Sequence, residues 1–324
     1  MVIRLLRRLW GTPGGETEDR PVESGSEEHA DSTAPGNVID LGGAHLTISN
    51  AQGLGTREEQ QDAFGVSDAS DPDFLSHGGV VAVVADGMGG LLGGGRASRE
   101  AVLRFIQAYR NKKPEEPVGA ALTRAIREAN QAVVNLAKVE GTFGNTGTTL
   151  VAAALVEGKL SWVSVGDSRL YLLRDGELHR VTMDHNVATA LEEMVAAGRM
   201  SAEEARDYPD LAALTSFIGI ECLDVIDQNV RPLPLRDGDR LLLCSDGLDG
   251  PLSDDEISQL ASGDPDLAAE SLVDAALSKG DAHQDNLTGV LLTYASETPP
   301  AVDHGHQSVD FGEFQPSDEA NDHA

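Results

Sequence analysis

Two long amphipathic helices are predicted one directly after the other, and strands are predicted through most of the remaining chain. Segments 98–111 and 117–141 each carry apolar residues at helical spacing, and the second ends at Gly141. Residues 148–182 instead hold three apolar runs joined by EGK and RDGE, which are typical of tight hairpin turns. Successive helices with hairpin-linked strands indicate antiparallel sheets covered by helices, not a parallel strand–helix alternation. We therefore expect an α+β fold.

Further elements are predicted on both sides of this central part. The alternating segment 44–53 predicts a half-buried strand, and the unbroken apolar run 80–85 predicts a fully buried one. Serine followed by glutamate three residues later predicts helix starts at Ser201 and Ser253. The last predicted elements are an amphipathic helix and a strand, at 266–280 and 286–295.

Charge is distributed unevenly along the chain. The net charge is −30, with +3 on residues 1–10, −7 on 11–43, −7 on 296–324 and −19 on 44–295. The flanking stretches lack apolar periodicity. We therefore predict a basic N-terminal segment with a disordered acidic linker (1–43), one folded domain (44–295) and a disordered acidic tail (296–324). So acidic a domain repels a phosphate backbone, which argues against nucleic acid as a partner, and it attracts divalent cations.

Membrane insertion is not predicted, because no apolar run approaches the roughly 18–20 residues of a membrane span. The opening MVIRLLRRLW lacks the apolar core of a signal peptide. It is compatible with a short basic helix on an anionic membrane surface, although a frayed terminus is the simpler interpretation. Cys222 and Cys244 lie in apolar surroundings without metal-binding spacing, which favours reduced core thiols in a cytoplasmic protein.

Five aspartates lie at the ends of apolar runs. Asp86 and Asp246 each follow a predicted buried strand and precede a glycine, Asp167 lies in a Gly-Asp-Ser corner, and Asp62 and Asp285 come just before strands. A single aspartate in such a place usually caps a turn. Five of them, on strands able to share one sheet edge, indicate a site where carboxylates converge, while the glycines let backbone carbonyls approach a ligand.

Converging carboxylates repel one another and require a counter-charge. Carboxylate, carbonyl and water oxygens are hard ligands that suit Mg²⁺ or Mn²⁺, whereas zinc favours histidine or cysteine, which these corners lack. Two such ions about 3.5–4 Å apart can activate a bridging water and stabilise an in-line displacement at phosphorus. The residues alone thus predict a divalent-metal site suited to phosphate-ester hydrolysis.

Ordered motifs across almost all of residues 44–295 carry a family resemblance. They are REEQQDAF, ADGMGG, GNTGTTL, VGDSRLYLLRDGEL, TMDHN, LTSFIG, CSDGL and DNLTG. With them the sequence resembles the metal-dependent serine/threonine protein phosphatases of type 2C, in their bacterial form. The resemblance implies a four-layer α-β-β-α sandwich with two central antiparallel sheets flanked by helices and a metal centre between the sheets.

The resemblance also implies roles for single residues. The expected ligands of two metal ions are Asp62, Asp86, Asp246, Asp285 and the Gly87 carbonyl. Asp86 would bridge both ions, and Asp167 matches a ligand of a weaker third metal, so two or three Mn²⁺ or Mg²⁺ ions are expected. Arg57 matches the arginine that grips the substrate phosphate, a role that suits a forked guanidinium.

Three further positions qualify this assignment. Met88 stands where eukaryotic members have histidine, so no histidine acid is available there. Asp249 fits either the third metal or the cap of the helix that follows it. His185 fits a residue that fixes a turn better than one that carries chemistry. Residues 186–219 match a flap beside the cleft, where substrate selection is expected.

The predicted function is hydrolysis of phosphoserine or phosphothreonine in proteins by metal-activated water, without a covalent intermediate, with Arg57 and Asp86 as catalytic residues. Two alternatives remain: a non-catalytic phosphoprotein-binding regulatory module on the same fold, and a small phosphate-ester hydrolase. The complete carboxylate set favours an enzyme over a binding module, and only a substrate panel separates the two enzymes. Expected partners are protein substrates of a serine/threonine kinase, and the chain is expected to be a monomer.

Overall fold

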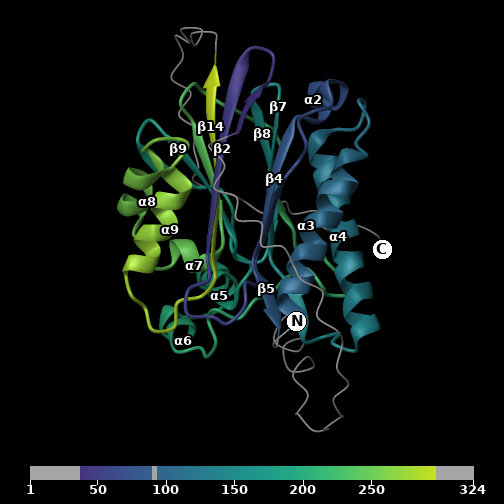
Figure 1. The fold of residues 1–324 in the computed structure, drawn as a ribbon. Coiled ribbons are helices and arrows are strands. Elements are labelled where there is room, and N and C mark those ends of the chain that lie inside the picture. The colour runs from purple at the N-terminus through teal and green to yellow at the C-terminus, as the bar shows by residue number, and fades with distance from the viewer. Residues whose placement is uncertain (1–36, 90–92, 297–324) are drawn as a thin grey trace.

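The computed structural model describes residues 37–89 and 93–296, which form four layers (Figure 1). Two sheets face each other in the middle, and helices cover the outer face of each. One sheet is covered by α3 (Gly93–Arg110) and α4 (Val118–Glu140), and the other by α8 (Asp254–Ala261) and α9 (Ala268–Ser278). The expected α-β-β-α sandwich is confirmed.

Both central sheets are antiparallel throughout. The first, the β14 sheet, has the order β1 (Asn37–Asp40), β2 (Ala44–Gly53), β14 (Leu287–Ser296), β13 (Arg240–Cys244), β9 (Arg169–Arg174), β10 (Glu177–Arg180). The second, the β4 sheet, has the order β11 (Asp227–Gln228), β8 (Lys159–Val165), β7 (Leu150–Val156), β4 (Val80–Ala85), β3 (Ala63–Val66), and β12 (Leu233–Pro234) also pairs with β8. A short ribbon joins β5 (Gly87–Gly89) to β6 (Thr146–Thr148).

The remaining helices are short. They are α2 (Pro72–Gly78), α5 (Val187–Ala196), α6 (Ala202–Arg206) and α7 (Asp246–Asp249). Ser201 and Ser253 begin α6 and α8 with complete capping boxes, as predicted. Gly141 ends α4 in the left-handed conformation with φ 72°, which also confirms the predicted stop.

Burial on both faces explains the unbroken apolar run of β4. Its side chains alternate between two apolar clusters, one beneath α3 and α4 and one between the two sheets. Val83 packs into the first cluster beside Phe105, and Val84 packs into the second, which also contains Leu243. A third cluster around Leu272 fills the space between the β14 sheet and its helices. The core is therefore aliphatic and divided into layers.

The strands of residues 148–182 are distributed over both sheets. The predicted hairpin turns join β7 to β8 and β9 to β10, and both use left-handed residues, with φ 50° at Glu157 and 54° at Asp175. The Gly-Asp-Ser corner between them is no hairpin, because β8 and β9 belong to different sheets. Asp167 therefore lies where the chain crosses from one sheet to the other.

Two expectations need correction. Strand β1 pairs with β2 in register Val38 with Thr47, so residues 37–40 form a strand within the segment 1–43 that was predicted to be disordered. Cys222 is exposed and only Cys244 is buried, so the prediction of two core thiols was wrong for Cys222. The predictions for 1–36 and 297–324 fall outside the described residues. In the part that is described, no helix has the length and apolar character needed to cross a membrane.

Candidate metal centre

The predicted ligand residues lie at one end of the sandwich, on both central sheets. Asp62 and Asp86 flank the paired strand ends Ala63 and Ala85 in the β4 sheet. Asp246 and Asp285 flank β13 and β14, which pair at this end of the β14 sheet. The expectation that all the aspartates share one sheet edge was therefore wrong. Two facing sheets each contribute, which agrees with the centre between sheets that the resemblance implied.

Asp62 connects the two sheets through its carboxylate. Its Oδ2 accepts hydrogen bonds from Ser245 Oγ at 2.7 Å and Thr288 Oγ1 at 2.8 Å; Ser245 directly follows β13 and Thr288 lies on β14. Its Oδ1 is buried and has no hydrogen-bond partner. The two hydroxyls thus leave one oxygen of the carboxylate for a ligand. The sequence predictions missed Ser245 and Thr288, although Ser245 directly precedes Asp246.

Asp86 is fixed through its backbone by the GNTGTTL motif. Its N–H donates to Thr149 Oγ1 at 2.9 Å, and its carbonyl accepts from Thr149 N at 2.8 Å and Thr148 Oγ1 at 2.7 Å. Gly87 follows in a confined space, where a β-carbon would overlap the carbonyl oxygens of Gly94 and Gln61. Glycine is therefore required here for close backbone packing.

Burial, together with neighbouring negative charge, raises the pKa values of Asp62, Asp86 and Asp167. Burial raises the pKa of Asp62 to about 6, against the lowering effect of its two hydroxyl partners, and the charges of Asp246 and Asp285 raise it further. Burial and the charges of Asp62, Asp246 and Asp285 raise the pKa of Asp86 well above its usual value. Burial also raises the pKa of Asp167 to about 7, with Asp246 as the next cause. The aspartates thus form one electrostatic group that needs a counter-cation to ionise fully.

Arg57 contacts one of the predicted ligands. Its Nη2 lies 2.7 Å from Asp285 Oδ2, and the two side chains are 55% and 43% exposed. The backbones are also joined, because Thr56 N–H donates to the Gln284 carbonyl at 2.9 Å and Asn286 Nδ2 donates to the Leu54 carbonyl at 2.9 Å. The structure therefore places the predicted phosphate-gripping arginine at the rim of the aspartate group.

The donor set fits hard divalent cations. Among residues 37–89 and 93–296, no three His, Cys, Asp or Glu side chains converge tightly enough to hold an ion as they stand. This agrees with mutual repulsion of the carboxylates and with the pairing of Asp285 to Arg57. The unpartnered Asp62 oxygen, the raised carboxyl pKa values and the all-oxygen chemistry nevertheless suit Mg²⁺ or Mn²⁺.

The contacts of Asp249 and His185 bear on the roles expected for them near Asp167. Ser253, and not Asp249, caps α8. Asp249 Oδ2 instead accepts from Arg169 Nη1 at 2.9 Å and from the Tyr171 hydroxyl at 2.7 Å. His185 Nδ1 accepts from the Gly166 N–H at 3.1 Å, and the backbone N–H of His185 donates to the Gly166 carbonyl at 2.9 Å. His185 thus fixes the turn before Asp167, as predicted.

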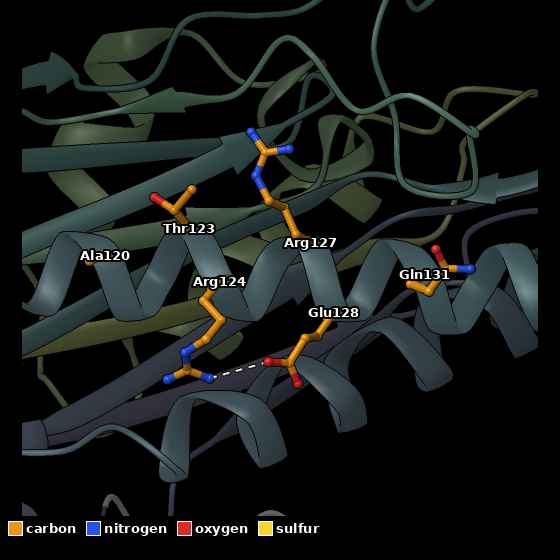
Figure 2. Close-up of a pocket in the computed structure, with 6 residues that line it drawn as sticks. All are labelled: Ala120, Thr123, Arg124, Arg127, Glu128 and Gln131. Atoms are coloured by element: carbon orange, nitrogen blue, oxygen red, sulfur yellow. Dashed lines mark hydrogen bonds and ion pairs between the residues drawn. The ribbon is translucent and has the colours of Figure 1, made fainter. Parts of the chain in front are cut away.

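A surface depression of about 590 Å³ lies elsewhere, along the outside of α4 (Figure 2). Figure 2 shows that its lining comes from that helix, with Arg124 directed toward Glu128. Arg124 also forms a two-point pair with Glu116 at 2.9 and 3.0 Å, which accounts for its charge. None of the predicted ligands lines this depression, so the aspartate group is the better candidate site.

Comparisons with known proteins identify similar chains. The protein phosphatase 2C family matches residues 55–289. Serine/threonine protein phosphatase PstP of Mycobacterium tuberculosis (strain CDC 1551 / Oshkosh) is 34% identical over 258 residues, which cover 78% of this chain and 45% of PstP. The chain thus spans about half the length of that relative. Serine/threonine phosphatase stp of Listeria monocytogenes serovar 1/2a is 32% identical over 217 residues, which cover 65% of this chain and 83% of stp.

A solved structure also matches this chain. The crystal structure of the catalytic domain of serine/threonine protein phosphatase PstP in complex with two manganese ions matches with a TM-score of 0.62 and 30% identity. The match covers 78% of this chain and 100% of the PstP chain in that structure.

Proposed function

Because this chain belongs to the protein phosphatase 2C family, we propose that it is a metal-dependent phosphatase that hydrolyses phosphoserine and phosphothreonine in proteins. The observation that carries this proposal is the meeting of aspartates from two facing sheets around a buried, unpartnered Asp62 oxygen. A binding module that only holds a phosphoprotein has no need for several mutually repelling carboxylates, whose pKa values are raised at a cost to stability.

The residues proposed to hold two Mn²⁺ or Mg²⁺ ions are Asp62, Asp86, Asp246, Asp285 and the Gly87 carbonyl. In this proposal Asp86 would contribute to both ions, and Asp167, whose carboxyl feels the charge of Asp246, would contribute to a third. When bound, such ions stabilise charge on the phosphate oxygens and lower the pKa of an attacking water. The protein contributes rigid placement, because Thr148 and Thr149 fix the Asp86 backbone, and Ser245 and Thr288 fix the Asp62 side chain.

Arg57 is the proposed phosphate-binding residue. Its guanidinium is half exposed, and the loop that carries it is hydrogen-bonded to residues 284–286 beside the proposed ligand Asp285. A forked guanidinium suits two phosphate oxygens. Met88 carries no proton to donate, and we propose that the leaving alkoxide takes its proton from water.

The setting of the enzyme is also a proposal. We infer a cytoplasmic monomer that reverses the action of a serine/threonine kinase. The unpaired state of Cys222 and Cys244 supports a reducing compartment. The substrate class is supported by the relatives, which are named as serine/threonine phosphatases.

A substrate panel tests this function against its alternatives. Purified protein with Mn²⁺ is offered phosphothreonine and phosphoserine peptides and a small aryl phosphate, and phosphate release is measured. We expect kcat/KM to be higher for the peptides than for the aryl phosphate. Hydrolysis of the aryl phosphate alone would favour the small-ester hydrolase. Peptide binding without any phosphate release would favour the non-catalytic module.

A further inference from the structure

A buried ionic network lies directly beside the candidate metal centre. Arg169 donates from Nε to Asp184 Oδ1 at 3.1 Å and from Nη2 to Asp184 Oδ2 at 2.8 Å, while its Nη1 donates to Asp249 Oδ2 at 2.9 Å. The side chains of Asp184 and Asp249 are only 6% and 1% exposed. One guanidinium therefore uses its whole fork to hold two buried carboxylates from different parts of the chain.

The network joins the two segments that carry Asp167 and Asp246. Arg169 begins β9, two residues after Asp167, and its strand position pairs with Cys244, two residues before Asp246. Asp249 is the last residue of the single-turn helix α7, whose first residue is Asp246. The contact between Arg169 and Asp249 therefore links the segment that carries Asp167 to the helix that carries Asp246.

The other end of the network fixes the corner that precedes Asp167. Asp184 is followed by His185, which exchanges two hydrogen bonds with Gly166 at 3.1 and 2.9 Å. The residues on both sides of Asp167 are thus bound to the same short segment, Gly166 through His185 and Arg169 through Asp184. This arrangement limits how far Asp167 can move relative to α7.

Asp249 is bound within this network through only one of its two carboxylate oxygens. Its Oδ2 receives both Arg169 and the Tyr171 hydroxyl, at 2.9 and 2.7 Å, while its Oδ1 is buried without a partner. A positive side chain already balances its charge. Through these two Oδ2 contacts Asp249 orients α7, whatever its Oδ1 binds.

We propose that Arg169 is a positioning residue for the metal centre, which sets the spacing between Asp167 and Asp246 by joining their segments through Asp184 and Asp249. This inference rests on the proposed function, because it assigns metal binding to Asp167 and Asp246. Lysine keeps the charge but offers no fork, so it cannot bind both carboxylates with the same geometry.

The same strand provides a matched control. Arg174, the last residue of β9, binds Asp239 from Nε at 2.9 Å and from Nη2 at 2.6 Å, and its side chain is 9% exposed. This pair has the same chemistry and is at least as buried, but it lies at the opposite end of β9 from Asp167. Arg174→Lys should therefore lower stability without affecting the metal centre.

The experiment compares Arg169→Lys, Arg174→Lys and Tyr171→Phe with the wild type. Thermal unfolding reports stability, and calorimetric titration with Mn²⁺, without substrate, reports metal affinity. Both lysine variants should lose thermal stability. Of the two, only Arg169→Lys should weaken the weakest Mn²⁺ binding step, by about tenfold or more, as expected for a residue that orients metal ligands. Tyr171→Phe removes one bond to Asp249 and should weaken the same step by a smaller factor.

The possible outcomes separate this inference from the proposed function. Equal Mn²⁺ affinity in Arg169→Lys and Arg174→Lys would overturn the positioning role, even if both variants are unstable. If Arg169→Lys does not fold, Tyr171→Phe decides: a weakened step supports the role, and unchanged affinity refutes it. A wild-type protein that binds no Mn²⁺ would refute the proposed function itself, and the inference with it.

Discussion

The two carboxylate oxygens of Asp62 have different surroundings. Two hydroxyls from the facing sheet occupy one oxygen of its carboxylate, and the other oxygen is buried without a partner. An unsatisfied buried oxygen is costly in a folded protein and is usually retained for a ligand or an ion. Arg57 complements it at the rim, where it holds Asp285 in an exposed ion pair. Each side chain therefore has one interaction that holds it and one that it can offer to substrate or metal.

Arg57→Ala separates substrate binding from metal binding. The loss of a charge-assisted contact to phosphate should lower phosphopeptide kcat/KM by roughly ten- to a thousandfold. The variant also frees Asp285 from an exposed ion pair, so Mn²⁺ affinity should rise by a factor of about 1.5–5. Arg57→Lys should recover part of the lost hydrolysis, since it keeps the charge without the fork. Kinetics and calorimetry on the same preparations check both effects, and unchanged hydrolysis by Arg57→Ala would remove Arg57 from the site.

The raised pKa of Asp62 makes the stability of the metal-free protein depend on pH. Its folded-state pKa is about 6, compared with an ordinary 3.8, so the folded state holds this proton more tightly than the unfolded state. The resulting stabilisation is complete below pH about 4 and is lost as the pH rises through about 6. It amounts to about 3 kcal/mol at most.

The matched comparison for this effect is Asp62→Asn. With chelator present, the Tm of the wild type relative to this variant should fall between pH 4 and 7, and saturating Mn²⁺ should reverse the trend because a cation favours the ionised carboxylate. Parallel Tm profiles of the two proteins would show that Asp62 does not titrate in this range.

At the scale of elements, the site depends on where strands end. The sequence singles out the aspartates because each lies at the end of an apolar run and several lie beside glycine. It could not show which sheet each strand joins, because that is decided by pairings between distant segments, such as β14 with β2. The same limit hid the Arg57–Asp285 pair and the two hydroxyls on Asp62, whose partners are separated by 183 residues or more in the chain.

Thr149 illustrates a role that only the fold reveals. Its Oγ1 accepts from the Asp86 N–H at 2.9 Å and lies 2.6 Å from Ser168 Oγ, so it joins the end of β4 to the residue that follows Asp167. Nothing in its spacing in the sequence distinguishes this threonine from one that only favours a strand.

Thr149→Val tests that role without a large change of shape. It leaves the Asp86 N–H without its acceptor, so the free energy of unfolding should fall by about 1–3 kcal/mol. Phosphopeptide turnover should fall as well, because Asp86 loses a positional restraint. Thr149→Ser restores the hydroxyl and should restore most of both quantities, as measured by thermal unfolding and steady-state kinetics. Equal behaviour of the valine and serine variants would contradict a hydrogen-bonding role.

Considered as a whole, the molecule places its chemistry at one end of a layered aliphatic core. Figure 1 shows α7 and β5 toward the same end of the sandwich, away from the β1–β2 end. The net charge of −19 on residues 44–295 favours the approach of divalent cations and disfavours that of polyanions. Because every predicted site residue lies within 37–296, we propose that this region is the functional domain.

Truncation tests this proposal and the corrected boundary together. A variant limited to 37–296 should turn over phosphopeptides within about twofold of the full chain, because it keeps both sheets and their core. A variant that starts at residue 44 also loses β1, which exposes the edge of β2, so its Tm should fall by a few degrees. Loss of activity in a soluble, folded 37–296 variant would show that an outer segment contributes to the site.

The most direct test of the central claim is phosphate release from a phosphothreonine peptide as divalent metal is removed and restored. We predict that the full chain releases phosphate with Mn²⁺, stops after chelation and resumes when Mn²⁺ is added back. Asp86→Asn and Asp246→Asn should remain folded yet lose at least about a hundredfold in turnover at every Mn²⁺ concentration, since each lacks an anionic ligand. Turnover that persists in chelator, or near-normal Mn²⁺-dependent turnover in either variant, would contradict a metal centre built on these aspartates.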